Sequence, residues 1–246
     1  MPNMEIDPDP KEKLQRLVAA IHARMAELRF EHASDSDATF IGRAWLRSIL
    51  AQAAAVSHLS NSPFGEAAIA NIRTMFETWA NLRYLLLHGD RTRNARKAYV
   101  NSLVEFAAFL TTIEEDRAPV IARLDELRKE YPDLVTEVEA QRKRGQYHWS
   151  GMNRTRVIED VGTKLPESDF TMRHIYKVLS WDAHGEMSAI RDVRMVDTER
   201  GQEQHFAYFL FPEQAANENA EMAGRILAAS WGVFATSFGL SGRLGP

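Results

Sequence analysis

The chain has 246 residues, of which 45% are hydrophobic and 26% are charged, and its formal net charge is −4. This composition is typical of a globular protein. Because the net charge is negative, the protein as a whole is not expected to bind nucleic acid or anionic lipid nonspecifically, but a local basic site is compatible with that charge. The sequence contains no cysteine, which excludes disulfides, thiolate metal ligands and cysteine nucleophiles.

The N-terminus is acidic and contains proline, without the basic and then apolar order of a signal peptide. No stretch approaches the roughly 18 consecutive apolar residues that cross a bilayer. We therefore expect a soluble, cytoplasmic protein with no membrane partner. Residues 1–10 are expected to form a flexible tail, residues 11–240 a single helical domain, and residues 241–246 a flexible end.

Helical periodicity runs through the first half of the chain. Apolar residues recur at helical intervals from Leu14 to Met25, and the run SDSD at 34–37 supplies N-cap chemistry for the next helix. Pro63 suits the first turn of a third helix, and a glycine-containing turn precedes a fourth. The first four helices are expected over about residues 9–32, 38–60, 63–88 and 92–116.

The second half is less regular. Pro119 begins a fifth, strongly charged helix, which is expected to bend near Tyr131–Asp133 because Pro132 cannot continue a helix. Residues 145–169 lose the periodicity and predict an ordered loop with at most one short helical turn. A sixth helix is expected over 168–185 and a last one over 212–240. Between them, the aromatic run HFAYFLF could pair with AIRDVRMV through a turn at Gly201.

No internal repeat, low-complexity linker or block of charge marks a domain boundary. Short connections between long helices favour antiparallel neighbours. We therefore predict an all-α fold, a single-domain antiparallel bundle of about six to seven helices, with a short β-hairpin near residues 190–211.

The first candidate site lies on the expected sixth helix, where Tyr176, Ser180 and His184 recur every four residues. On an ideal helix, Arg173, Lys177, Ser180 and His184 fall within an arc of about 60°. This mixture of a cation, a hydroxyl and an imidazole differs from the Lys/Glu pairs of a generic exposed face, and it ends beside Gly185, where a backbone can approach a ligand closely. The residues form either a reactive site or the polar edge of an ordinary helix.

The second candidate lies on the expected third helix, where Arg73, Glu77 and Asn81 are spaced by four residues. The rest of that helix is apolar over a broad arc, which predicts that it is central to the bundle. Its apolar residues are Ile69, Ile72, Met75, Phe76, Trp79, Leu82 and Leu86. If the helix is central, the polar side chains need partners, and His184 or Tyr176 could supply them. The alternative is an exposed Arg–Glu pair, worth about 0.2–0.5 kcal/mol.

The third candidate is the segment RKRGQYHWSGMNRTR, residues 142–156, in which cations surround aromatic residues beside two glycines. That combination suits contact with phosphates and stacking on bases. The alternative is a loop packed down by Trp149, with its cations in solvent. A fourth cluster, Arg93, Arg96 and Lys97, is expected to be an ordinary solvated face.

Several familiar chemistries are absent from the sequence. It has no glycine-rich phosphate loop, no HExxH motif and no ExxH spacing of the kind that builds carboxylate di-iron sites. The eight histidines are scattered, so a metal held by His148, His184 and Glu77 would need a long-range coincidence. No cofactor is predicted, and a divalent metal is not excluded.

Three short segments resemble, in their order along the chain, an uncharacterised bacterial family of all-helical proteins known as a domain of unknown function. The segments are RTMFETWANLRYLL (73–86), YHWSG (147–151) and YKVLSWDAH (176–184). The resemblance covers about residues 38–190. It implies that one site contains Arg73, Glu77, Trp149, Ser150, Tyr176, Ser180 and His184. A looser similarity is to HEPN-type helical ribonucleases of toxins and phage-defence systems, which carry an arginine four to six residues before a histidine. Here Arg173 precedes His184 by eleven residues, which departs from that pattern.

Two functions stay open. In the first, a polar core site binds or acts on RNA or a nucleotide, and as an enzyme the protein would be a ribonuclease or another phosphodiester or nucleotide hydrolase. His184 would then act as acid or base, Glu77 would orient it, and Arg73 would stabilise a developing anion. The remaining catalytic candidates are Tyr176 and Ser180, and the substrate-binding candidates are His148, Trp149, Ser150, Arg154 and Arg173.

In the second, the protein is a non-enzymatic binding or assembly module, and the same polar residues form a structural hydrogen-bond network. The apolar end of the last helix, residues 226–240, could then serve a homodimer or pack inside the monomer.

Overall fold

The computed structural model describes residues 9–27, 36–62, 65–160, 193–196, 205–208 and 212–240. Helices make up most of these residues, which confirms the predicted all-α fold. In chain order the elements are α1 (Pro10–Glu27), α2 (Ser36–Ser60), the 3-10 helix η1 (Gly65–Ala68), α3 (Ile69–Leu87), α4 (Arg91–Thr112), α5 (Ala118–Glu130), α6 (Pro132–Lys143), α7 (Arg154–Asp160), β1 (Val193–Val196), β2 (His205–Tyr208) and α10 (Pro212–Ser237).

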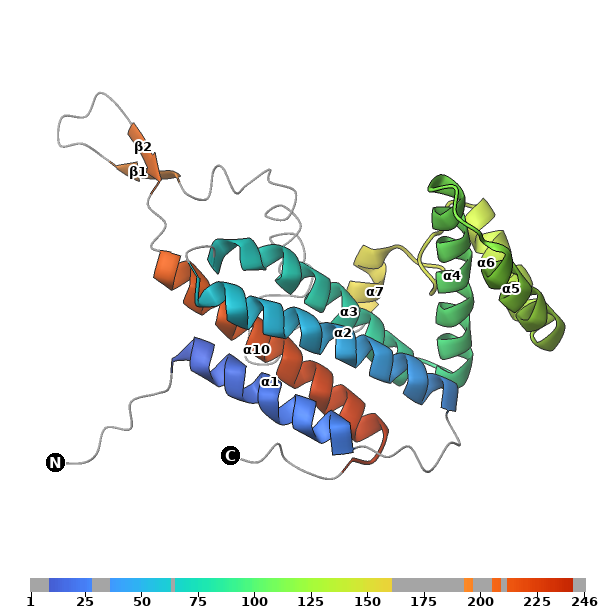
Figure 1. Cartoon of the computed structure of the whole chain (residues 1–246), viewed down its shortest axis with the longest axis horizontal. Coiled ribbons are helices and arrows are strands. Elements are labelled where there is room, and N and C mark those ends of the chain that lie inside the picture. Colours follow the sequence, from blue (N-terminus) through green and yellow to red (C-terminus); the bar gives the residue numbers. More distant parts are fainter. Residues whose placement is uncertain are drawn as a thin grey trace.

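Helices α1, α2, α3 and α10 lie side by side as a bundle (Figure 1). Helix α3 contacts α2, α10, α4 and α7, so it is the central helix that its broad apolar arc predicted. Ile72, Phe76 and Trp79 are fully buried in the bundle core. Because the bundle core buries the apolar arc of α3, the polar face of α3 is the one that contacts α7.

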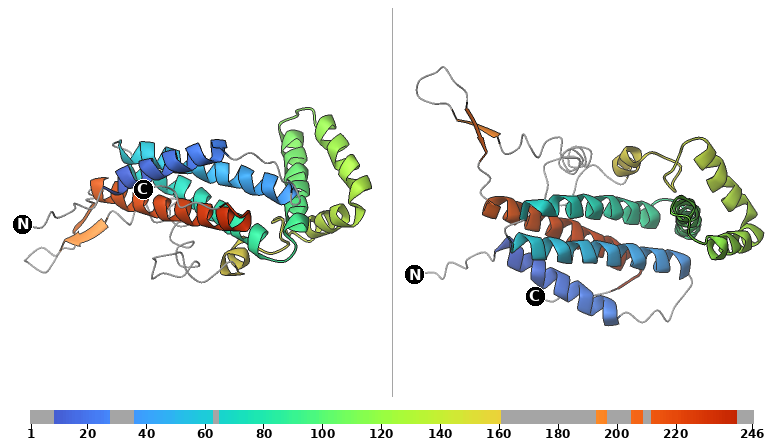
Figure 2. Two further views of the ribbon diagram at one scale, coloured as in Figure 1. Left: turned by 90° about the horizontal axis from the view of Figure 1, so that it is seen from below. Right: turned by 45° about the horizontal axis from the view of Figure 1, so that its top comes forward.

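Helices α4, α5 and α6 form a smaller lobe across one end of the bundle (Figures 1 and 2). This lobe has its own hydrophobic core, and α4 connects it to the bundle through contacts with α2 and α3. The buried residues of the lobe core are Val100, Leu124, Leu127, Leu134, Val135 and Val138. The bend expected near Tyr131–Asp133 is a break between two helices, because α5 ends at Glu130 and Pro132 is the first residue of α6.

The loop after α6 contains the short helix α7, in agreement with the expected helical turn, and α7 packs on α3. Strands β1 and β2 pair antiparallel in the segment where a hairpin was expected, with Val193 opposite Tyr208 and Val196 opposite His205. The expected sixth helix, with Arg173, Tyr176, Ser180 and His184, lies outside the described residues. Among the helices that are described, none is long and apolar enough to cross a membrane.

Candidate functional site

The polar face of α3 carries an ion pair between residues one helical turn apart. The Arg73 Nε atom lies 3.1 Å from the Glu77 Oε1 atom, and each side chain is only 19% exposed. The other carboxylate oxygen of Glu77, Oε2, accepts a hydrogen bond of 2.9 Å from Nη1 of Arg154 on α7. Glu77 therefore links two arginines from two helices, as a half-buried carboxylate requires.

The third polar residue of this face, Asn81, receives two hydrogen bonds from the loop between α6 and α7. Its Oδ1 atom lies 2.7 Å from Nε2 of His148 and accepts a bond of 3.0 Å from Nε1 of Trp149. One amide oxygen thus holds two consecutive loop residues against the central helix.

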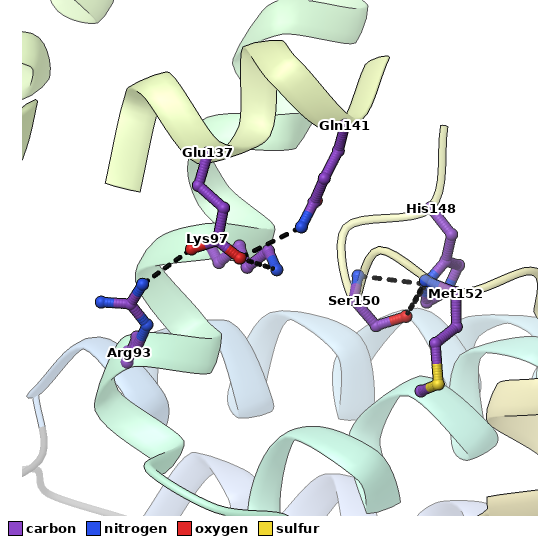
Figure 3. A network of polar contacts seen from close by, with 7 residues as sticks. All are labelled: Arg93, Lys97, Glu137, Gln141, His148, Ser150 and Met152. Atoms are coloured by element: carbon purple, nitrogen blue, oxygen red, sulfur yellow. Dashed lines mark hydrogen bonds and ion pairs between the residues drawn. The ribbon is translucent and has the colours of Figure 1, made fainter. Parts of the chain in front are cut away.

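The second ring nitrogen of His148 faces Ser150. Its Nδ1 atom accepts a 3.2 Å hydrogen bond from the backbone N–H of Ser150 and lies 2.8 Å from the Ser150 Oγ atom. Nδ1 is therefore the acceptor, and Nε2 carries the hydrogen that is donated to Asn81. Ser150 Oγ in turn accepts from the backbone N–H of Met152 at 3.2 Å (Figure 3). The polar groups of this turn satisfy one another.

Burial sets the protonation state of His148. Desolvation, with smaller contributions from the positive charges of Arg154 and Lys97, lowers the pKa of His148 from its ordinary value of 6.5 to about 4. The imidazole is therefore neutral at pH 7, which its hydrogen bonds to Asn81 and Ser150 require. A base with so low a pKa accepts protons poorly near neutrality.

Trp149 anchors the loop through packing. Its side chain is 5% exposed. The ring centroid lies 5.8 Å from that of Trp45 on α2 and 5.5 Å from that of Tyr84 on α3. The cavity left beside the network, lined by Glu77, Asn81, His148 and Arg154, has a volume of only about 10 Å³. It can hold at most about one water molecule, so the described network is a packed junction.

Gly151 brings the loop against the α4–α6 lobe. Its φ angle is +79°, and a Cβ atom there would lie 2.7 Å from Nε2 of Gln141. Gln141 is itself buried and donates to Glu137 at 3.1 Å (Figure 3). Only glycine fits both the positive φ and the short distance to Gln141.

The face of α4 that was expected to be solvated is solvated only in part, because Arg93 is exposed whereas Lys97 is buried against Glu137. The Oε1 atom of Glu137 accepts from Nζ of Lys97 at 2.6 Å and its Oε2 atom from Nη2 of Arg93 at 2.7 Å (Figure 3). Burial alone would raise the pKa of Glu137, but these two cations outweigh it and lower that pKa. Because α6 packs on α4, the cations stabilise a helix junction.

In contrast to this packed part, other residues of the segment 142–156 are exposed to solvent. Tyr147 is 62% exposed, and the Arg142 guanidinium carbon lies 5.3 Å from the centre of its ring. The side chains of Lys143, Arg144 and Arg156 are exposed, and none forms an ion pair with another described residue. The loop therefore has a packed inner part with Trp149 and His148, and the surrounding segment 142–156 carries exposed cations and one exposed aromatic ring.

The structure thus brings together a part of the predicted site. Arg73, Glu77 and Arg154 form one bonded group, and His148, Trp149 and Ser150 form a second group through Asn81. The two groups border the same small cavity. His184, Tyr176, Ser180 and Arg173 are outside the described residues. Among the described residues, no three His, Asp or Glu side chains are placed to hold a metal ion.

The described partners of Asn81 differ from the ones expected. Its position four residues after Glu77, on a helix predicted to be central, indicated that it needed a buried partner, which His184 or Tyr176 could supply. The partner that the structure shows was out of reach, because His148 lies 67 residues away in an aperiodic loop.

Comparison with protein families gives one match. A family model described as "Family of unknown function (DUF5677)" covers residues 39–203, which is more than half of the chain. The match includes α3, the loop and α7, and therefore all the described site residues. No curated protein and no solved structure matches the chain.

Proposed function

The chain belongs to this family of unknown function, and we propose that its domain binds single-stranded RNA or a nucleotide through the outer side of the loop between α6 and α7. This surface, the loop face, consists of Arg142, Lys143, Arg144, Tyr147 and Arg156. The observation that carries the proposal is the ring of Tyr147, which is 62% exposed in a cationic segment. The Arg142 guanidinium over this ring is itself paired with Glu105 at 3.3 Å, so the exposed cations that form no ion pair with another described residue are Lys143, Arg144 and Arg156.

The loop face offers the two interactions that single strands use. An exposed tyrosine ring stacks on a base of any identity, and such stacking is worth about 1–3 kcal/mol per base. Exposed cations without a carboxylate partner are available to phosphates, and Lys143, Arg144 and Arg156 are of this kind. Since the molecule carries a net charge of −4, binding is expected to be local to this surface.

The packed inner side supports the same function by fixing the loop before binding. Trp149 is held between aromatic rings, His148 is bonded to Asn81, and Gly151 rests on Gln141. A loop that is ordered in advance loses less conformational entropy when a ligand binds.

A binding function also agrees better with the chemistry of His148 than catalysis does. Its low pKa and the small size of the cavity beside it favour a structural role for the described part of the polar core. The catalytic set His184, Tyr176, Ser180, Glu77 and Arg73 stays a prediction. RNA cleavage by the parent protein that is lost in His184→Ala, with the free energy of unfolding unchanged, would favour an enzyme instead.

The test is a fluorescence anisotropy titration of a labelled single-stranded RNA, with single-stranded DNA and a mononucleotide as parallel ligands. The double variant Lys143→Ala/Arg144→Ala should bind RNA more weakly. Its slope of log K against log salt should be shallower by about 1.4, or about 0.7 for each lost phosphate contact.

The matched control is Lys129→Ala. Lys129 is exposed at the C-terminal end of α5, and the length of α6, about 18 Å for its 12 residues, separates it from the loop face. This variant should bind like the parent. The absence of binding to all three ligands, or an equal loss in both variants, would contradict the proposal.

A further inference from the structure

A cleft of about 430 Å³ opens where α2 meets the α4–α6 lobe. Its volume lies within the range of roughly 300–1,000 Å³ that small-molecule sites occupy. The cleft is bordered by α2, by α4 and by the corner between α5 and α6, and thus lies between the two hydrophobic cores. Its functional side chains are Asp37, Phe40, Arg96, Tyr99, Arg123 and Tyr131.

Three aromatic rings from three parts of the chain border this inter-lobe cleft. Phe40 on α2 is 66% exposed, although it is a large apolar residue next to buried positions of the same helix. The guanidinium carbon of Arg96 lies 4.4 Å from the centre of the Tyr131 ring, and that of Arg123 lies 6.0 Å from the centre of the Tyr99 ring. One face of each tyrosine ring is thus covered by an arginine, whereas the exposed Phe40 ring is open to stack on a planar ligand.

Both arginines of the cleft are paired with carboxylates. The Arg96 Nε atom lies 2.6 Å from Asp37 Oδ2, and the Arg123 Nη1 atom lies 2.7 Å from Glu126 Oε2. Glu130 adds a second carboxylate to the lining, and its interaction with the neighbouring Tyr131 raises the pKa of Tyr131. Since both arginines are already neutralised, the cleft has no free cation to attract an anion.

We propose that the inter-lobe cleft binds a neutral heteroaromatic molecule that carries hydroxyl or amino groups, the chemistry of a nucleoside without its phosphates. The planar ring stacks on the exposed Phe40 ring, and the hydroxyl or amino groups donate hydrogen bonds to the carboxylates of Asp37 and Glu130. A phosphate would approach two carboxylates without an available cation, so it would weaken binding. This site is separate from the loop face and does not depend on the function proposed for it.

The test is isothermal titration calorimetry of the full-length protein with the four common ribonucleosides and their monophosphates. At least one nucleoside should bind, and more tightly than its monophosphate. Phe40→Ala should weaken that binding by roughly tenfold or more, as expected for the loss of one stacking contact. Phe40→Trp should keep it. Because Phe40 is exposed, neither change should alter the unfolding midpoint.

Leu87→Ala is the matched control, because Leu87 is a similarly exposed apolar residue, 54% exposed, that does not line the cleft. It should bind the nucleoside like the parent. RNA binding at the loop face should be unchanged in Phe40→Ala, so the failure of one proposal is distinguishable from the failure of the other. No nucleoside binding by the parent, or equal binding by Phe40→Ala, would overturn the inference.

Discussion

The Nε2 atom of His148 lies 2.7 Å from the Oδ1 atom of Asn81, which ties the loop before α7 to the central helix of the bundle. The same oxygen also accepts from Trp149, so a single amide on α3 determines where the loop lies. The cationic outer side of the loop depends on this junction for its position. The junction therefore connects the stability of the fold to the proposed binding surface.

Asn81→Ala should be strongly destabilising. The substitution leaves the ring N–H groups of His148 and Trp149 without an acceptor in a buried place, at a cost of about 1–3 kcal/mol each. The free energy of unfolding from urea titration should fall by about 2–4 kcal/mol. Asn81→Asp is the matched variant, because it keeps an acceptor oxygen, and it should lose less. Equal losses in the two variants would mean that these hydrogen bonds do not carry the effect.

The low pKa of His148 predicts a specific dependence of stability on pH. The unfolded side chain takes up a proton near pH 6.5, whereas the folded one does so only near pH 4. Between these values the unfolded state binds more protons, so stability is full above about pH 6.5 and is lost as the pH falls toward 4. The loss attributable to His148 should be about 3 kcal/mol.

The measurement is the free energy of unfolding of the parent and of His148→Gln at several values between pH 4 and 7. The glutamine does not titrate, so the difference between the two proteins should shrink as the pH falls. A difference that stays constant across this range would show that His148 is not the group responsible.

Gly151→Ala should cost more stability than the same change at Gly89. Both glycines have a positive φ, +79° at Gly151 and +61° at Gly89, so both substitutions carry backbone strain of about 1–2 kcal/mol. At Gly151 the added methyl group also meets Gln141, whereas at Gly89 it meets no atom within 4 Å. Urea unfolding of the two variants separates the strain from the clash. If Gly89→Ala costs as much, the Gln141 contact is unimportant.

Glu137→Gln should destabilise the junction between α4 and α6 more than Lys97→Met does. Removing the carboxylate leaves the buried Lys97 ammonium without its charge partner, which costs about 3–5 kcal/mol. In Lys97→Met, Glu137 keeps its ion pair with Arg93 and remains partly exposed, at 34%. Thermal and urea unfolding of both variants check the order. The reverse order would mean that the cation is not held by Glu137 in solution.

Local patterns were sufficient to predict most of the elements that the structure describes. The apolar arc of α3 identified it as the central helix, and Pro132 predicted the interruption between α5 and α6. Both features are determined by residues within a few helical turns of one another. Such patterns say which face of a helix is buried, and that was enough for the fold class.

Long-range polar partners could not be predicted in the same way. The cations of α4 were expected in solvent because their carboxylate, Glu137, lies 40 residues beyond Lys97. His148 could not be paired with Asn81, since its loop has no periodicity to show which side is buried. The inter-lobe cleft was missed because Phe40, Tyr99 and Tyr131 lie on different elements and form no local motif.

The central claim is that the loop face binds single-stranded RNA or a nucleotide through Tyr147, and an anisotropy titration of Tyr147→Ala and Tyr147→Phe with single-stranded RNA tests it most directly. Tyr147 is 62% exposed, so both variants should fold like the parent. The phenylalanine keeps the ring and should bind like the parent, while the alanine should bind roughly tenfold more weakly because it loses one stacked base. Binding by Tyr147→Ala that is as tight as that of the parent would contradict the claim.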